Sequence, residues 1–181
     1  AEATERMMEK IKAAKIAGDS LGGTGGFVAT GLPVGLGDPI YEKLEANLAK
    51  AMMGLPASKG FEIGEGFNAG RMTGSTHNDL FIKMDYKIQT ESNRAGGTLG
   101  GISTGMPLYG RVAFKPTSSI KLPQESLDLE GAPIIFQLPE GSRHDPCVAI
   151  RAVPVVEAMV ALVLADALLL NRSAQLSTWS K

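Results

Sequence analysis

An arginine and an aspartate stand two positions apart, at Arg143 and Asp145, directly before Pro146. A guanidinium offers a planar set of donors that suits a carboxylate or a phosphate. A carboxylate held in place by its surroundings can take or give a proton. The pair therefore indicates an anion-binding corner with an acid–base group. The alternative is that the two charges only brace a turn before the proline.

A second polar segment covers residues 115–119 and follows a strand-like run. It consists of Lys115, Pro116, Thr117, Ser118 and Ser119. One ammonium and three hydroxyl groups within five residues make a donor set for phosphate or sugar oxygens. A polar turn between two strands would use the same residue types, so both interpretations stay open at this point.

Common metal-binding and catalytic motifs are absent from the sequence. The chain has two histidines and one cysteine, too few for an ordinary structural zinc site, so no metal is expected. The phosphate loop, the GxGxxG fingerprint after a strand, HExxH and GxSxG do not occur. We expect His77 on a surface loop. His144 is expected to orient its neighbours Arg143 and Asp145.

Charge and cysteine content narrow the class of protein. The 181 residues carry 18 basic and 19 acidic side chains, a net charge of −1, so neither nucleic acid nor a membrane is expected as a partner. Cys147 is the single cysteine, which excludes an intramolecular disulfide. The most apolar stretch, 153–170, contains Pro154, Glu157 and Asp166, and predicts a buried helix rather than a membrane span.

Two helices are predicted in the first third of the chain. Apolar residues at helical spacing favour a helix over 2–17 that ends at Gly18. Asp38 and Pro39 are typical of a cap and first position, so a second helix is expected to begin there and to end at Gly54. Its apolar stripe comprises Ile40, Leu44, Leu48, Ala51 and Met52.

Alternating or β-branched runs predict strands at 27–30, 61–63, 84–88, 108–114 and 134–138. A polar, glycine-rich loop is expected between the second and third of these runs. A third helix, 154–170, is apolar nearly all round and must be covered on both sides. Together these elements indicate the α+β class, with apolar helices packed between antiparallel sheets.

Six uncommon sequence words occur in one order along the chain. They are GDSLGG (18–23), GLPVGLGDP (31–39), PASKGFEIGEGF (56–67), SNRAGGTLGGISTG (92–105), FKPTSSI (114–120) and RHDPCVAIRAVPVVEAM (143–159). These words resemble the signatures of the chorismate synthase family. The resemblance covers nearly the whole chain and implies that residues 1–181 form the C-terminal portion of a single domain, with 172–181 as a frayed tail.

The family resemblance carries expectations about activity. It implies an anti 1,4-elimination of phosphate from 5-enolpyruvylshikimate-3-phosphate that yields chorismate and requires reduced FMN. It also implies a β-α-β sandwich and a homotetramer. A flavin-binding module with NADPH-dependent reductase activity and a non-catalytic structural fragment remain the alternatives.

Site residues follow from the same resemblance. Asp145 and Arg143 are expected to be catalytic, with Arg143 also at the flavin. The flavin is further expected to contact Pro56, Ala57, Gly100, Lys115, Pro116, Thr117, Ser118 and Ser119. Pro56 departs from the asparagine common in bacterial members, and a proline offers neither a side-chain amide nor an N–H.

The family's chain is about twice this length, and its two acid–base histidines and substrate-holding arginines belong to motifs that this sequence lacks. We therefore expect the missing N-terminal half to complete the site and the isolated chain to be inactive. Its single thiol is compatible with a reducing compartment, so the cytoplasm is expected, with the plastid as the alternative for a plant protein.

Overall fold

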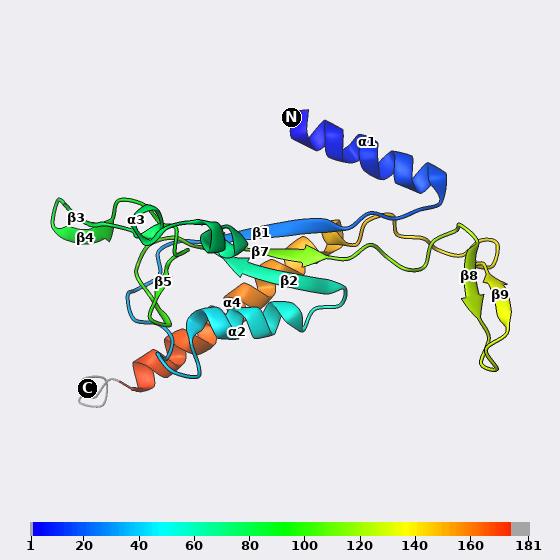
Figure 1. Cartoon of the computed structure of the whole chain (residues 1–181). Coiled ribbons are helices and arrows are strands. Elements are labelled where there is room, and N and C mark those ends of the chain that lie inside the picture. Colours follow the sequence, from blue (N-terminus) through cyan, green and yellow to red (C-terminus); the bar gives the residue numbers. More distant parts are fainter. Residues whose placement is uncertain (1, 175–181) are drawn as a thin grey trace.

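The computed structural model describes residues 2–174. Figure 1 shows a central sheet with two helices along one face, the N-terminal helix apart on the other side, and hairpins beyond both ends of the strands. The helices are α1 (Glu2–Ala17), α2 (Leu44–Met53), α3 (Gly74–His77) and α4 (Ala149–Ser173), with a 3-10 helix η1 (Gly66–Arg71). The strands are β1 (Gly23–Ala29), β2 (Ser58–Ile63), β3 (Phe81–Met84), β4 (Lys87–Thr90), β5 (Thr98–Leu99), β6 (Ile102–Ser103), β7 (Leu108–Phe114), β8 (Gln124–Leu127) and β9 (Pro133–Phe136).

The central sheet has the order β1-β7-β2, and both pairings are antiparallel. In β7, Leu108, Val112 and Phe114 point to the same face and are buried, as expected from the two-residue period of a strand. The register places Phe114 opposite Gly23 on one side and Ser58 on the other. The end of β7 and the starts of β1 and β2 therefore share one edge of the sheet.

Helices α2 and α4 cover that buried face (Figure 1). Leu44, Leu48 and Met52 of α2 are fully buried, which confirms most of the predicted stripe. The start of α4 lies directly against β1. A Cβ added to Gly23 would come within 2.7 Å of the Ala149 Cβ, so glycine permits this close approach.

The rest of α4 is much less covered. Of its most apolar 18-residue window, 17% is buried within residues 2–174. Leu162 and Leu169 are 63% and 64% exposed, while Val156 and Val160 face the core. The α+β class is confirmed, and these residues supply one sheet and one helix layer of the expected sandwich. The expected cover on both sides of α4 is not provided by the described residues.

By length and composition alone, α4 is also the one described helix that could cross a membrane. Its Val156 and Val160 stripe nevertheless packs in the same core as β7 and α2. One side of α4 therefore belongs to the core, while its opposite side is left exposed by the described residues.

Two predicted elements are corrected. The second helix begins at Leu44 rather than at Asp38, because residues 38–42 form turns in which the Asp38 N–H donates to the Glu42 carbonyl. Ile40 is consequently 70% exposed instead of lying in the apolar stripe. The single strand predicted over 84–88 is instead a β3–β4 hairpin, whose turn places Asp85 at φ 54°.

Other boundaries shift by several residues. Strand β1 already begins at Gly23, since glycines within a sheet are tolerated where a helix presses against the backbone. Helix α4 begins at Ala149 and accommodates Pro154 near its start. It continues to Ser173, so the tail assigned to 172–181 starts as helix, and its portion at 175–181 lies outside the described residues.

Candidate functional site

Two of the predicted cofactor-binding segments meet at the shared edge of the sheet. The backbone N–H of Lys115 donates to the carbonyl oxygen of Ala57 at 2.9 Å. This contact follows from the antiparallel pairing of β2 with β7, which places Ser58 opposite Phe114. Ala57 has a φ of 65°, an uncommon conformation for a residue with a Cβ. Pro56 and Ala57 therefore form a tight bend directly beside the lysine.

The segment that precedes β1 joins this edge. Ser20 is 8% exposed, and its hydroxyl donates to the Thr117 carbonyl oxygen at 2.6 Å. The Leu21 N–H donates to the Pro146 carbonyl oxygen at 2.8 Å. Residues 19–21 thus connect the 115–119 turn with the chain around Arg143 and Asp145. Sequence reasoning did not assign them a role, although the word GDSLGG marked their position.

His144 makes a second connection between the same parts. Its Nδ1 lies 2.9 Å from the Ser119 carbonyl oxygen, and its Nε2 lies 2.7 Å from the Asp19 carbonyl oxygen. The expectation that His144 orients its neighbours agrees with this position between the two segments.

The Asp145 carboxylate is held from two sides. One oxygen lies 3.1 Å from the Arg151 guanidinium on α4, and the other accepts a hydrogen bond from the Cys147 N–H at 3.3 Å. The side chain keeps 31% of its surface exposed. Arg143, in contrast, is exposed, and its side chain forms no hydrogen bond or ion pair with residues 2–174. Sequence analysis missed Arg151, although it stands in the same sequence word as Asp145.

The 115–119 turn has donors to spare. Lys115 and Ser118 are exposed, and Thr117 and Ser119 are half-buried. Within residues 2–174, their side chains form no hydrogen bond with the protein, so an ammonium and three hydroxyls remain for a ligand. This donor set is compatible with a phosphate and a polyhydroxylated chain, and Asp145 adds an accessible carboxylate.

Gly100 does not join these residues. It lies in the turn between β5 and β6, and the neighbouring Gly101 accepts a hydrogen bond from the Leu44 N–H at the start of α2. Gly97 packs against Leu108, at the opposite end of β7 from Lys115. Seven strand residues span roughly 20 Å, so these residues alone do not form a single site with Gly100.

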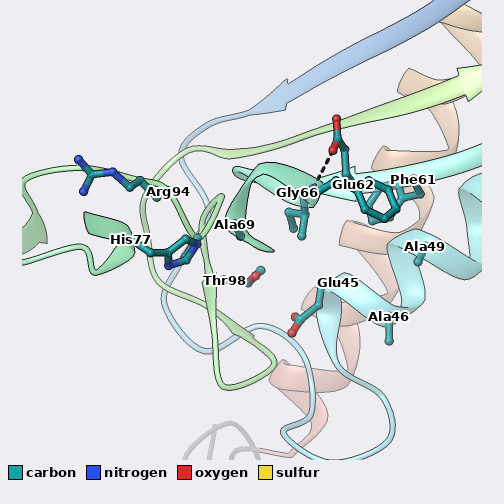
Figure 2. Close-up of a pocket in the computed structure, with 13 residues that line it drawn as sticks. Glu45, Ala46, Ala49, Phe61, Glu62, Gly66, Ala69, His77, Arg94 and Thr98 are labelled. Atoms are coloured by element: carbon teal, nitrogen blue, oxygen red, sulfur yellow. Dashed lines mark hydrogen bonds between the residues drawn. The ribbon is translucent and has the colours of Figure 1, made fainter. Parts of the chain in front are cut away.

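A separate cavity of about 630 Å³ lies between α2, β2, η1 and residues 94–98 (Figure 2). Glu45, Thr98 and His77 surround it, while the Arg94 side chain is directed away. Among the described residues, one Glu45 carboxylate oxygen is buried without a hydrogen-bond partner. None of the residues expected at the flavin lines this cavity. The structure places His77 at the end of the short helix α3, half-buried rather than on an open loop.

Asp79 anchors the wall next to this cavity. Its carboxylate accepts hydrogen bonds from the Ser92 hydroxyl at 2.6 Å and from the N–H groups of Arg94 and Ala95 at 2.8 and 2.9 Å. Burial acts to raise the pKa of Asp79. The hydrogen bonds from Ser92, Ala95 and Arg94, with the Arg94 charge, outweigh burial and hold the pKa below its ordinary 3.8.

Within residues 2–174, no group of three or more histidine, cysteine or acidic side chains is arranged to hold a metal ion. The donors gathered at the edge of the sheet are an ammonium, hydroxyl groups and backbone N–H groups, which suit an organic anion by their own chemistry.

Comparisons with known proteins identify what this arrangement is similar to. A family model described as chorismate synthase matches residues 1–169. Chorismate synthase from Protochlamydia amoebophila is 59% identical over 97% of this chain and 48% of the relative, and that from Opitutus terrae is 51% identical over 96% and 47%. A chorismate synthase crystal structure at 35% identity superposes with a TM-score of 0.75 over 94% of this chain and 44% of the other. The chain thus spans about half the length of the relatives it matches.

Proposed function

Since the chain belongs to the chorismate synthase family, we propose that it is the C-terminal part of a lyase acting in chorismate formation. The proposed reaction is the anti 1,4-elimination of phosphate from 5-enolpyruvylshikimate-3-phosphate. Reduced FMN is the proposed cofactor. When bound, it supplies an electron-rich ring system that assists departure of the phosphate without a net change in redox state.

The observation that supports this proposal most strongly is the meeting of Ala57, residues 115–119 and Asp145 at one edge of the sheet. The Lys115 N–H bonds to Ala57, and the 115–119 turn connects through Ser20 and His144 to the segment that carries Asp145. The unused ammonium and hydroxyl groups match the phosphate and ribityl oxygens of FMN.

Distinct roles are proposed for the residues at this edge. Lys115 and the hydroxyls of Thr117, Ser118 and Ser119 hold the anionic end of the cofactor. Asp145, kept in place by Arg151 and the Cys147 N–H, holds or accepts a proton at its carboxylate. The exposed guanidinium of Arg143 contributes positive charge for an anionic group of substrate or cofactor.

The remaining half of the relatives' length is proposed to complete the enzyme. The substrate-binding arginines and acid–base histidines expected in the family would come from that part. The exposed side of α4 offers a surface on which further protein can pack. A homotetramer is proposed on the same family grounds. A cytoplasmic location is proposed because the single thiol is compatible with a reducing compartment, with the plastid as the alternative for a plant protein.

Pro56 and Gly100 were both expected at the flavin, but only Pro56 lies near Lys115. Pro56 stands at the bend beside Lys115, where its shape or its carbonyl oxygen is available to the cofactor. Gly100 lies at the far end of β7, so its predicted contact would require groups beyond this edge.

The proposal is tested by an anaerobic assay of the full-length protein with reduced FMN and 5-enolpyruvylshikimate-3-phosphate. Chorismate should form and should depend on reduced flavin, whereas the 181-residue chain under the same conditions should give none. Absence of chorismate from folded, FMN-loaded full-length protein would overturn the proposed function. NADPH oxidation measured in parallel tests the reductase alternative, which none of the present observations favours.

A further inference from the structure

His144 lies between the two segments proposed to hold FMN, and its ring contacts both sides of the junction. Nδ1 is 2.9 Å from the carbonyl oxygen of Ser119, the last residue of the polar turn. Nε2 is 2.7 Å from the carbonyl oxygen of Asp19, on the segment before β1. Both distances are within the normal range for N–H···O hydrogen bonds.

Both partners of the ring are acceptors. A backbone carbonyl oxygen has no hydrogen to donate, so each contact requires an N–H on the histidine side. A neutral imidazole carries one N–H and can satisfy only one of the two contacts. The imidazolium carries two, and its positive charge strengthens both hydrogen bonds.

The position of His144 in the chain links its two contacts to the candidate site. Arg143 and Asp145 are the immediate neighbours of His144, while Ser119 closes the turn that begins at Lys115. A ring that donates in both directions therefore fixes the distance between the proton-handling carboxylate and the phosphate-holding turn.

We propose that His144 is a positioning residue that, as an imidazolium donating to Ser119 and Asp19, fixes the Asp145 segment against the 115–119 turn. This inference rests on the proposed function for its effect on flavin, but the double hydrogen bond stands independently. His144 does not itself contact substrate or cofactor in this account.

The surrounding charges bear on how protonation acts here. The Asp19 carboxylate accepts from the Ser20 N–H, and the Asp145 carboxylate pairs with Arg151, so both are already engaged. The other charged groups on the segments that meet here are Lys115, Lys121 and Arg143. A ring that has lost one of its two N–H protons can donate to only one of the two carbonyl oxygens, so this loss breaks one contact.

The test compares His144→Phe and His144→Gln in the full-length protein with His77→Gln as the matched control. Phenylalanine keeps a ring but donates nothing, whereas glutamine can still donate to one carbonyl. The dissociation constant of FMN is measured at pH 6 and pH 8.5 for each. The ratio of variant to wild type is compared, since FMN's own phosphate titration then cancels.

His144→Phe loses both hydrogen bonds, so its ratio should be about ten or more at pH 6. The ratio should be smaller at pH 8.5, because a ring that has lost one proton donates only one hydrogen bond for phenylalanine to remove. His144→Gln should show a smaller ratio, and His77→Gln should stay near one at both pH values. A His144→Phe ratio near one at pH 6 would overturn the proposal. So would a ratio that is the same at both pH values, which indicates a merely structural role.

Nitrogen NMR of histidine-labelled wild-type protein decides the case if the variants fold poorly. The resonances of His144 are assigned in the wild-type protein through correlations from its ring to its own backbone amide. Two slowly exchanging ring N–H signals at pH 6 are expected, and a single one would refute the imidazolium. If the full-length protein binds no FMN, the proposed function fails, and this NMR measurement still tests the double hydrogen bond.

Discussion

The backbone N–H of Lys115 donates to the carbonyl oxygen of Ala57 at 2.9 Å, where strand β7 ends and strand β2 begins. The two residues are distant in sequence, and only the antiparallel register brings them together. The site at this edge is therefore a product of the sheet. Substitutions that disturb the bend at Ala57 should therefore displace Lys115, and substitutions that displace the Lys115 backbone should disturb the bend.

Ala57 itself offers a direct test of this bend. Its φ of 65° is unfavourable for a β-branched side chain. In the full-length protein, Ala57→Val should lower the free energy of unfolding by about 1–2 kcal/mol and weaken FMN binding. Ala57→Gly, the matched control, should change stability by less than about 1 kcal/mol. Urea unfolding of both variants checks this, and equal stability would contradict the strained bend.

Variants of Asp145 and Arg151 should distinguish a residue that takes part in proton transfer from one that only holds it in place. Asp145→Asn keeps the shape but removes the proton-accepting carboxylate, so kcat should fall by about 10²-fold or more. Arg151→Gln removes an ion pair whose arginine is 81% exposed, and such pairs contribute under about 1 kcal/mol to stability. Its kcat should therefore fall much less. Steady-state kinetics decide, and equal losses in both variants would contradict the assigned roles.

Acid pH should lower the stability of the segment beside the Glu45 cavity, because Asp79 anchors that segment through its carboxylate. Its hydrogen bonds hold the folded-state pKa below 3.8, so the carboxylate stabilises the fold above about pH 4, and this contribution is lost as the pH falls through the folded-state pKa. Asp79→Asn should lower stability at pH 6 and lose less than wild type between pH 5 and pH 3.

The exposed Asp85→Asn serves as the control for Asp79 and should follow the wild-type pH profile. Urea midpoints at each pH provide the measurement. A wild-type profile for Asp79→Asn would show that its hydrogen bonds carry no pH-dependent stability.

The uncovered side of α4 predicts a stability effect that residues 2–174 do not account for. Leu162 is 63% exposed here, and truncating such a residue would ordinarily change stability by no more than about 0.5 kcal/mol. If the rest of the full-length protein covers this face, Leu162→Ala should cost about 2–5 kcal/mol there. Leu129, fully exposed on the β8–β9 turn, provides the matched Leu→Ala control. Equal, small effects would mean that the face stays open.

Sequence patterns predicted best where local periodicity and burial agree. Strand β7 and the α2 positions Leu44, Leu48 and Met52 could be predicted because one face of each is buried and recurs with the right period. The helix over 2–17 was also predicted from its spacing, although Ala14 is the residue that it buries. The start of the second helix was predicted wrongly, because Asp38 and Pro39 are typical of a helix N-terminus but here lie in a turn. Gly23 could not be predicted as a strand residue from local sequence. Glycine is required there because Ala149 of α4 packs against it, and this contact depends on the tertiary fold.

The candidate site shows the same division. Asp145 and residues 115–119 could be proposed from residue type and family resemblance. Arg151, Ser20 and the double contact of His144 could not, because they depend on how the segment before β1 meets the start of α4. Gly100 stays a prediction, since the described residues place it at the other end of β7.

A crystal structure of the full-length protein with FMN bound tests the central claim most directly. The FMN phosphate or ribityl oxygens should contact Lys115 and the hydroxyls of residues 117–119, with Ala57 and Asp145 lining the same pocket. An FMN molecule that touches neither Lys115 nor Asp145, for example one bound in the Glu45 cavity of Figure 2, would contradict it.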